Sequence, residues 1–170
     1  TEFVKFVEFE SPALTEYCGR RTTVRASIAL PPSYSAAALG KYPVVYRVEG
    51  FGSTESATWR LATGAQQSMA QGKAPAMIHV FLDPSCPGGH HAFADSENNG
   101  PWGRALTTEF IPHLERKFRL LSKPHARFLS GHSSGGWSTL WLQITYPEFF
   151  GGTWSTAPDP AAGANVDERA

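Results

Sequence analysis

The sequence predicts an α/β fold, a three-layer sandwich in which a mostly parallel sheet with antiparallel N-terminal strands lies between helices. Two segments near the start, 3–9 and 22–30, alternate apolar and polar residues as antiparallel strands do. After them, short apolar runs alternate with longer segments of helical periodicity, which is typical of strand–helix–strand units. The 170 residues contain no internal repeat and fit one domain, 1–170.

Strands are expected where apolar residues cluster between turn residues. In segment 22–30 the even positions from 24 onward are apolar and share one face, while Arg25 and Ser27 lie on the other, so this strand is expected to be half exposed. The run AMIHVFL at 76–82 is nearly all apolar, as in a strand covered on both faces, and His79 is expected to be a satisfied core histidine. Further strands are predicted at 43–48, 126–130 and 152–156.

Helical periodicity marks three segments, 55–71, 102–118 and 135–146. Gly72 follows the first, as a residue suited to a helix end. Pro112 lies inside the second and should cause a kink, because proline removes a helix hydrogen bond. Right-handed connections would place the loops after the parallel strands along one edge of the sheet, where α/β proteins bind their ligands.

Composition excludes several classes of partner. Lys plus Arg and Asp plus Glu each number 15, so the formally neutral chain has no built-in attraction to nucleic acid or an anionic membrane. The longest apolar run is far shorter than the roughly 20 residues of a spanning helix. Thr1 opens the chain without a leader pattern, which fits a cytoplasmic protein and also an exported one whose leader was removed. Cys18 and Cys86 could pair in an oxidising compartment or stay separate in a reducing one.

The motif that carries chemistry is Gly131-His-Ser-Ser-Gly135, which matches G-x-S-x-G. A nucleophilic serine in this pattern needs a sharp strand-to-helix turn with small residues on either side. Here the predicted strand 126–130 runs in and the predicted helix 135–146 runs out. The sequence therefore predicts Ser133 as the nucleophile of an α/β-hydrolase-type sheet, the alternative being a glycine-rich turn without catalysis.

A serine hydrolase also needs amide donors for the oxyanion that develops in its transition state. The amide of Ser134 follows the nucleophile at a helix N-terminus and is the first candidate. Loop 49–53 (EGFGS) follows an earlier strand, and its glycines let the backbone face inward. We favour Phe51 as the second donor, with Gly52 next, whereas the alternative is that this loop is only a turn.

Three longer segments match a known family in order: PVVYRVEGFG at 43–52, NNGPWGRALTTEFIPHLERKFR at 98–119, and FLSGHSSGGWSTLWLQITYPEFFGGTWSTAPDP at 128–160. In these segments the chain resembles the putative-esterase family of α/β-hydrolases, which includes S-formylglutathione hydrolases (esterase D), feruloyl and enterochelin-type esterases and mycolyltransferases. The resemblance implies ester hydrolysis or acyl transfer through an acyl-serine, with no metal and no other cofactor. It also implies an oxyanion amide just after the first glycine of the loop, here Phe51.

The expected triad is incomplete, because no histidine follows Ser133, whereas in this fold the acid and then the histidine come after the serine. The resemblance likewise implies an acid and a histidine beyond residue 160, so the domain is expected to be short at its C-terminus. Candidates within the chain are His90 and His91 as base, because their loop opens on the catalytic edge. Asp159 is the acid candidate, with a turn role as its alternative. The chain has no recognisable metal-ligand spacing, so no metal site is predicted.

These observations favour a serine esterase that hydrolyses a small carboxylic ester through an acyl-serine intermediate. Two alternatives stay open: an acyltransferase, which differs only in what attacks the acyl-serine, and a non-catalytic α/β-hydrolase scaffold used for binding or assembly. An open edge at the last strand and uncovered helix faces would invite self-association, so we expect a homo-oligomer.

Overall fold

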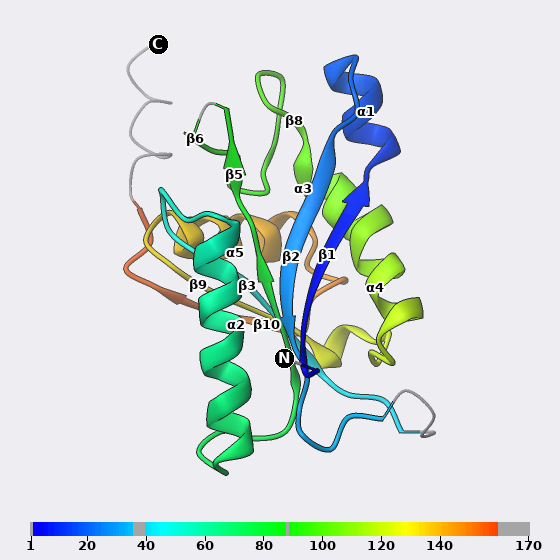
Figure 1. Cartoon of the computed structure of the whole chain (residues 1–170). Helices are drawn as coiled ribbons and strands as arrows, with labels where there is room; N and C mark the ends of the chain where they lie inside the picture. Colours follow the sequence, from blue (N-terminus) through cyan, green and yellow to red (C-terminus); the bar gives the residue numbers. More distant parts are fainter. Residues whose placement is uncertain (1, 36–39, 88, 160–170) are drawn as a thin grey trace.

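The computed structural model describes residues 2–35, 40–87 and 89–159. Its main sheet has six strands in the order β1-β2-β4-β3-β9-β10 (Figure 1). These are β1 (Val4–Glu10), β2 (Thr23–Ala29), β3 (Val44–Val48), β4 (Ile78–Leu82), β9 (Arg127–His132) and β10 (Gly152–Thr156). Strand β2 is antiparallel to both of its neighbours, β1 and β4, whereas β4, β3, β9 and β10 run parallel. The predicted mixed sheet, parallel after its first strands, is confirmed.

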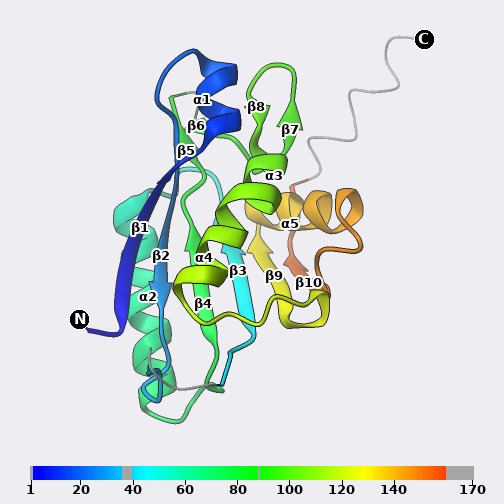
Figure 2. The same cartoon turned by 90° about the vertical axis from the view of Figure 1, so that its right-hand side faces the viewer.

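Helices cover the two faces of the sheet unequally (Figures 1 and 2). Helix α2 (Glu55–Ala70) packs on β1, β2 and β4 over a small apolar cluster that includes Ala62, Met69 and Phe81. The other face carries α3, η1, α4 and α5 over the larger core. Their bounds are α3 (Trp102–Ala105), the π-helical turn η1 (Leu106–Phe110), α4 (Ile111–Lys117) and α5 (Ser134–Thr145), and a short 3₁₀ turn, η2 (Pro124–Ala126), precedes β9.

Two expectations need correction. Strand β2 is not half exposed, because α2 covers its polar face: Ser27 is fully buried there, and its hydroxyl lies 3.1 Å from that of Thr58 on α2. Helix α1 (Pro12–Cys18) was not predicted, although its end signals are present in the sequence. The Ser11 side chain accepts from the Leu14 amide, and Gly19 ends the helix with φ 63°.

The long loop between β4 and α3 forms two short hairpins above the end of β4 (Figure 1). The first pairs β5 (Ser85–Cys86) with β6 (Gly89–His90), and the second pairs β7 (Asp95–Ser96) with β8 (Gly100–Pro101). Cys86 in the first hairpin and Cys18 in α1 are both free thiols. No helix in the described ranges is long and apolar enough to cross a membrane.

Candidate active site

Ser133 occupies a sharp turn between β9 and α5. Its backbone has φ 56° and ψ −127°, a combination that L-residues rarely adopt. The Ser133 amide donates to the Thr156 carbonyl (3.1 Å), and the Ser133 carbonyl accepts from the amides of Trp137 (3.0 Å) and Asp159 (3.3 Å). A strained conformation of this kind costs about 1–3 kcal/mol and persists only where its surroundings fix it, most often at functional sites.

Gly131 and Gly135, on either side of Ser133, must be glycines because a side chain would not fit there. A Cβ on Gly131 would lie 2.1 Å from the Gly135 carbonyl oxygen, and a Cβ on Gly135 would lie 2.0 Å from the Val48 carbonyl oxygen. Such distances are impossible without moving backbone. The start of α5 is therefore pressed directly onto the ends of β3 and β9, and this packing explains the small residues of the motif.

Loop 49–53 lies against the Ser133 side chain. Val48 pairs with Gly131 in the sheet, so the loop begins beside the turn that carries Ser133. A Cβ on Gly50 would lie 3.5 Å from the Ser133 Cβ and 3.9 Å from its Oγ. These are ordinary van der Waals distances, so the loop backbone at Gly50 lies next to the Ser133 side chain.

The three amides proposed as oxyanion donors are available. Phe51 and Gly52 lie in loop 49–53, and Ser134 is the first residue of α5, where a helix leaves its own amides unsatisfied. None of these amides takes part in a hydrogen bond among the described residues. Gly52 has φ 82°, a conformation that favours glycine. Their role as oxyanion donors stays a prediction.

His90 contacts loop 49–53 rather than Ser133. Its Nε2 lies 3.0 Å from the Glu49 carbonyl oxygen, and its Nδ1 accepts from the Ala92 amide at 2.9 Å. Both bonds fit the neutral tautomer with a proton on Nε2. In this tautomer only Nδ1 has a lone pair that can accept a hydrogen bond or a proton. Burial lowers the pKa of His90, partly opposed by the bond to Glu49 and the charge of Asp83. Because that lone pair is already used, these contacts do not favour the base role expected from the sequence.

His91 is buried against Trp102 and Phe93. Its ring is stacked on Trp102 with centroids 3.5 Å apart, and its Nδ1 accepts from the Phe93 amide at 3.2 Å. Burial, reinforced by His90, holds the pKa of His91 well below its ordinary value. No hydrogen bond joins either histidine to the Ser133 side chain within the described residues. These contacts are those of a core histidine, and the role of His91 as base stays a prediction.

Asp159 lies beside Ser133, as its place after β10 suggested. Its amide donates to the Ser133 carbonyl, and its carboxylate accepts from the Ser134 hydroxyl at 3.4 Å. These contacts fit a turn residue that fixes the start of α5, and its role as catalytic acid stays a prediction. No cluster of three or more potential metal ligands occurs among residues 2–35, 40–87 and 89–159.

Comparison with known proteins identifies the family. The sequence model of the family described as "Putative esterase" matches residues 15–162. The chain belongs to this esterase family. A curated relative, the "Uncharacterized protein YbbA" of Bacillus subtilis (strain 168), is 26% identical over 138 residues, which are 75% of this chain and 53% of the relative.

Solved structures of esterases share the fold. A ferulic acid esterase superposes with a TM-score of 0.75 at 21% identity, covering 91% of this chain and 58% of that protein. FphF of Staphylococcus aureus, a fluorophosphonate-binding serine hydrolase, gives a TM-score of 0.67 at 17% identity, covering 91% of this chain and 56% of that protein. The chain therefore spans little more than half the length of these three proteins.

Proposed function

We propose that the protein is a serine esterase in which Ser133 attacks the carbonyl carbon of a small carboxylic ester. The observation that carries the proposal is the strained backbone of Ser133 between β9 and α5, with φ 56° and ψ −127°. Membership of the esterase family supports the same reaction class. The alternative that the sequence left open is a scaffold of this fold without catalysis.

In the proposed reaction the Ser133 Oγ forms a bond to the ester carbonyl carbon and gives its proton to a base. The carbonyl oxygen becomes an oxyanion, which the amides of Phe51, Gly52 and Ser134 would bind. The bond to the alcohol oxygen then breaks, and the alcohol leaves with a proton. Water hydrolyses the acyl-serine and restores the enzyme. An acyltransferase would follow the same course, with another alcohol in place of water.

The test uses the protein expressed from its complete gene. A fluorophosphonate probe should label one serine, and mass spectrometry of peptides should place the label on Ser133 rather than on the neighbouring Ser134. The variant Ser133→Ala should lose labelling and lower the hydrolysis of p-nitrophenyl acetate by at least about 10⁴-fold, because the nucleophile acts as a unit with its base. A half-buried serine on α2, changed in Ser68→Ala, serves as the control.

Two results would contradict the proposal. Equal turnover by Ser133→Ala would show that this serine is not the nucleophile. A folded wild-type protein that neither reacts with the probe nor hydrolyses esters would favour the non-catalytic scaffold.

A further inference from the structure

His90 connects the first hairpin of the long loop to loop 49–53. The Nε2–H of its ring donates at 3.0 Å to the Glu49 carbonyl, which lies in the peptide unit before the one that carries the Phe51 amide. On the other side of the ring, Nδ1 accepts from the Ala92 amide at 2.9 Å. Ala92 and Phe93 have φ 57° and 50°, so consecutive strained residues shape the turn that points this amide at the ring.

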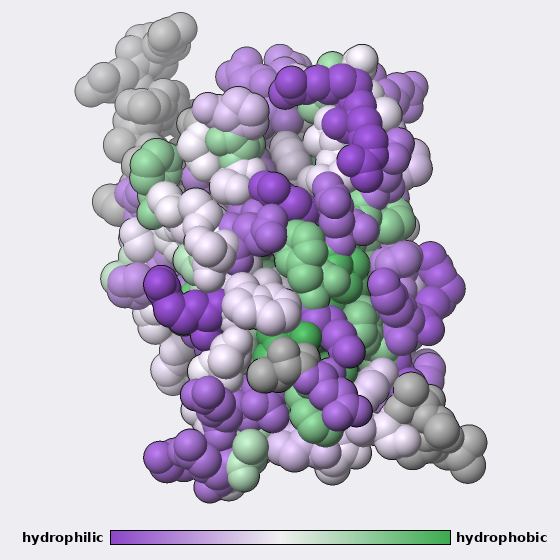
Figure 3. Space-filling model, in the orientation of Figure 1, coloured by the Kyte–Doolittle hydropathy of each residue, from purple (hydrophilic) through white to green (hydrophobic). Residues whose placement is uncertain are grey.

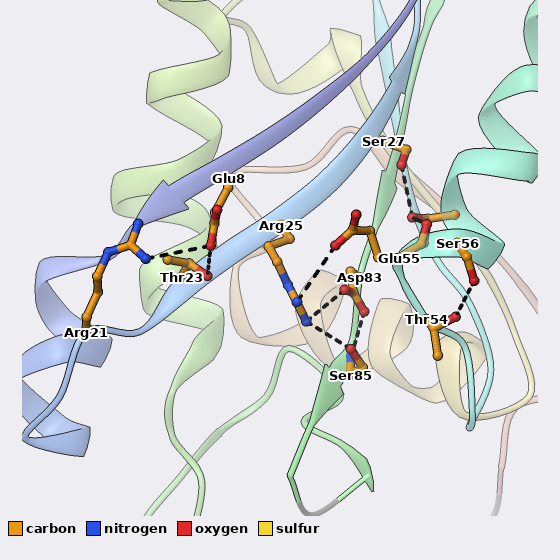
Figure 4. Close-up of polar contacts among 11 residues, drawn as sticks. Glu8, Arg21, Thr23, Arg25, Ser27, Thr54, Glu55, Ser56, Asp83 and Ser85 are labelled. Carbon is orange, nitrogen blue, oxygen red and sulfur yellow. Dashed lines mark hydrogen bonds and ion pairs between the residues drawn. The ribbon is translucent and has the colours of Figure 1, made fainter.

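The hairpin that carries His90 is itself firmly anchored (Figure 4). The Asp83 side chain is fully buried, and its Oδ2 lies 2.9 Å from Nη2 of Arg25 on β2. The Asp83 Oδ1 accepts from the Ser85 amide at 3.0 Å, and Arg25 Nη2 donates to the Ser85 hydroxyl at 3.0 Å. Glu55 at the start of α2 adds a carboxylate 4.0 Å from Arg25. The start of the hairpin that carries His90 is therefore fixed to the sheet.

The hairpin also meets the side chain of Phe51. The rings of Phe51 and His90 are nearly parallel, with centroids 6.5 Å apart and planes 19° apart. A Cβ on Gly89 would lie 2.9 Å from Phe51 Cε2, so a side chain there would displace the Phe51 ring from this position. Phe51 remains 73% exposed, so the hairpin covers only part of its ring.

We infer that His90 is a positioning residue of the esterase site: it fixes loop 49–53 through the Glu49 carbonyl and so aims the Phe51 amide at the oxyanion. The inference rests on the proposed function, because it assigns a purpose to the geometry of that amide. A neutral imidazole suits the task, since it donates on one side and accepts on the other. Donors of this kind act by being held in place before the reaction begins.

The experiment compares His90→Ala with His90→Gln in the protein expressed from its complete gene. Glutamine can donate from Nε2 to the Glu49 carbonyl and accept at Oε1 from the Ala92 amide, yet it cannot serve as a base. We expect His90→Ala to lower kcat roughly 10- to 100-fold with KM changed far less, because a displaced catalytic group costs up to about 100-fold. His90→Gln should recover most of the loss. His125→Ala, at an exposed histidine in η2, is the matched control.

Hydrogen exchange of the amides at 49–53 gives a second measurement that does not depend on turnover. These amides should exchange faster in His90→Ala than in the wild type and in His90→Gln. Unchanged exchange in His90→Ala would overturn the inference even if activity fell. Failure of glutamine to restore turnover, together with loss of the acidic limb of the pH profile, would instead make His90 the base and would also overturn it.

Failure of the proposed function gives a different result. If the wild type is folded but inert toward esters and the fluorophosphonate probe, the esterase proposal falls. The exchange experiment then still decides whether His90 fixes loop 49–53. Melting temperatures of all variants separate a loss of loop geometry from a loss of folding.

Discussion

Ser133 is held in its strained conformation mainly by backbone atoms. The carbonyl of Thr156 and the amides of Trp137 and Asp159 bind its peptide groups, and glycines on either side allow α5 to approach the strands. Backbone geometry also matters in loop 49–53, where Gly50 lies next to the serine side chain and Gly52 adopts φ 82°. The geometry of Ser133 and of loop 49–53 therefore depends on the directions of peptide groups as much as on which side chains are present.

Gly52 offers a test of the loop at a single residue. Nothing lies within 4 Å of a Cβ placed there, so Gly52→Val should act through its backbone conformation rather than through a clash. We expect kcat to fall by roughly 10- to 1,000-fold, and more than KM rises, because the moved donors act mainly in the transition state. Steady-state kinetics on p-nitrophenyl acetate measures both constants.

The control for this variant is Gly72→Val. Gly72 also has a positive φ, 69°, with nothing within 4 Å, but it follows α2 rather than lying in loop 49–53. Gly72→Val should be destabilised by the same unfavourable backbone conformation as Gly52→Val, but its kcat should stay unchanged. An unchanged kcat in Gly52→Val would show that the loop is only a turn.

At the level of elements, the sequence pattern predicted the six strands of the main sheet, most of which are buried apolar runs that leave a strong signal, whereas β10 has no buried residue. Segment 102–118 was predicted as one kinked helix and forms α3, η1 and α4 in succession, with the π-helical turn just before Pro112. Pro112 then lies in the first turn of α4, where a missing amide costs little. The contacts of His90 could not be read from sequence, because they depend on two loops that only the fold brings together.

His79 on β4 was predicted to be a satisfied core histidine and is only partly buried. His79 Nδ1 has no partner among the described residues, which corrects the expectation of a satisfied ring. Burial, with a smaller effect of Arg47, lowers the pKa of His79 to about 4. The neutral ring is therefore the form that the folded state prefers.

This shift predicts a loss of stability in acid. An unfolded histidine has a pKa near ~6.5, so between about pH 6.5 and 4 the unfolded chain binds a proton that folded His79 does not. The free energy of unfolding should therefore rise with pH across this window, by on the order of 1–3 kcal/mol from this residue. Urea unfolding of the wild type and His79→Gln at about pH 7 and about pH 4.5 measures the difference.

The variant should lose less stability on acidification than the wild type. His125→Gln, at an exposed position, should behave as the wild type does. An equal acid loss in His79→Gln and the wild type would refute the assignment.

Across the whole molecule, the two faces of the sheet are covered to different degrees. The face under α2 is closed over β1, β2 and β4, but over β3, β9 and β10 it forms an open hollow of about 500 Å³. Val45, Phe128 and Trp154 line this hollow, and Trp154 is 74% exposed. A second apolar area lies over the first strands, between α2 and α4 (Figure 3), where Phe6 is 38% exposed. Both edge strands of the sheet therefore have apolar surface beside them.

Apolar surface next to an unpaired strand edge favours association, so we predict that the 170-residue chain forms a homo-oligomer rather than an 18.5 kDa monomer. If the hollow beside β10 is the contact, Trp154→Glu should shift the mass measured by light scattering toward the monomer, because it places a charge in the interface. Ile144→Glu is the matched control, since Ile144 is 77% exposed but lies on α5, away from the hollow. A wild-type mass of one chain over a wide range of concentration would refute the prediction. If both variants lowered the measured mass equally, the hollow would not be the contact. A charge at any exposed apolar site would then be enough to weaken association.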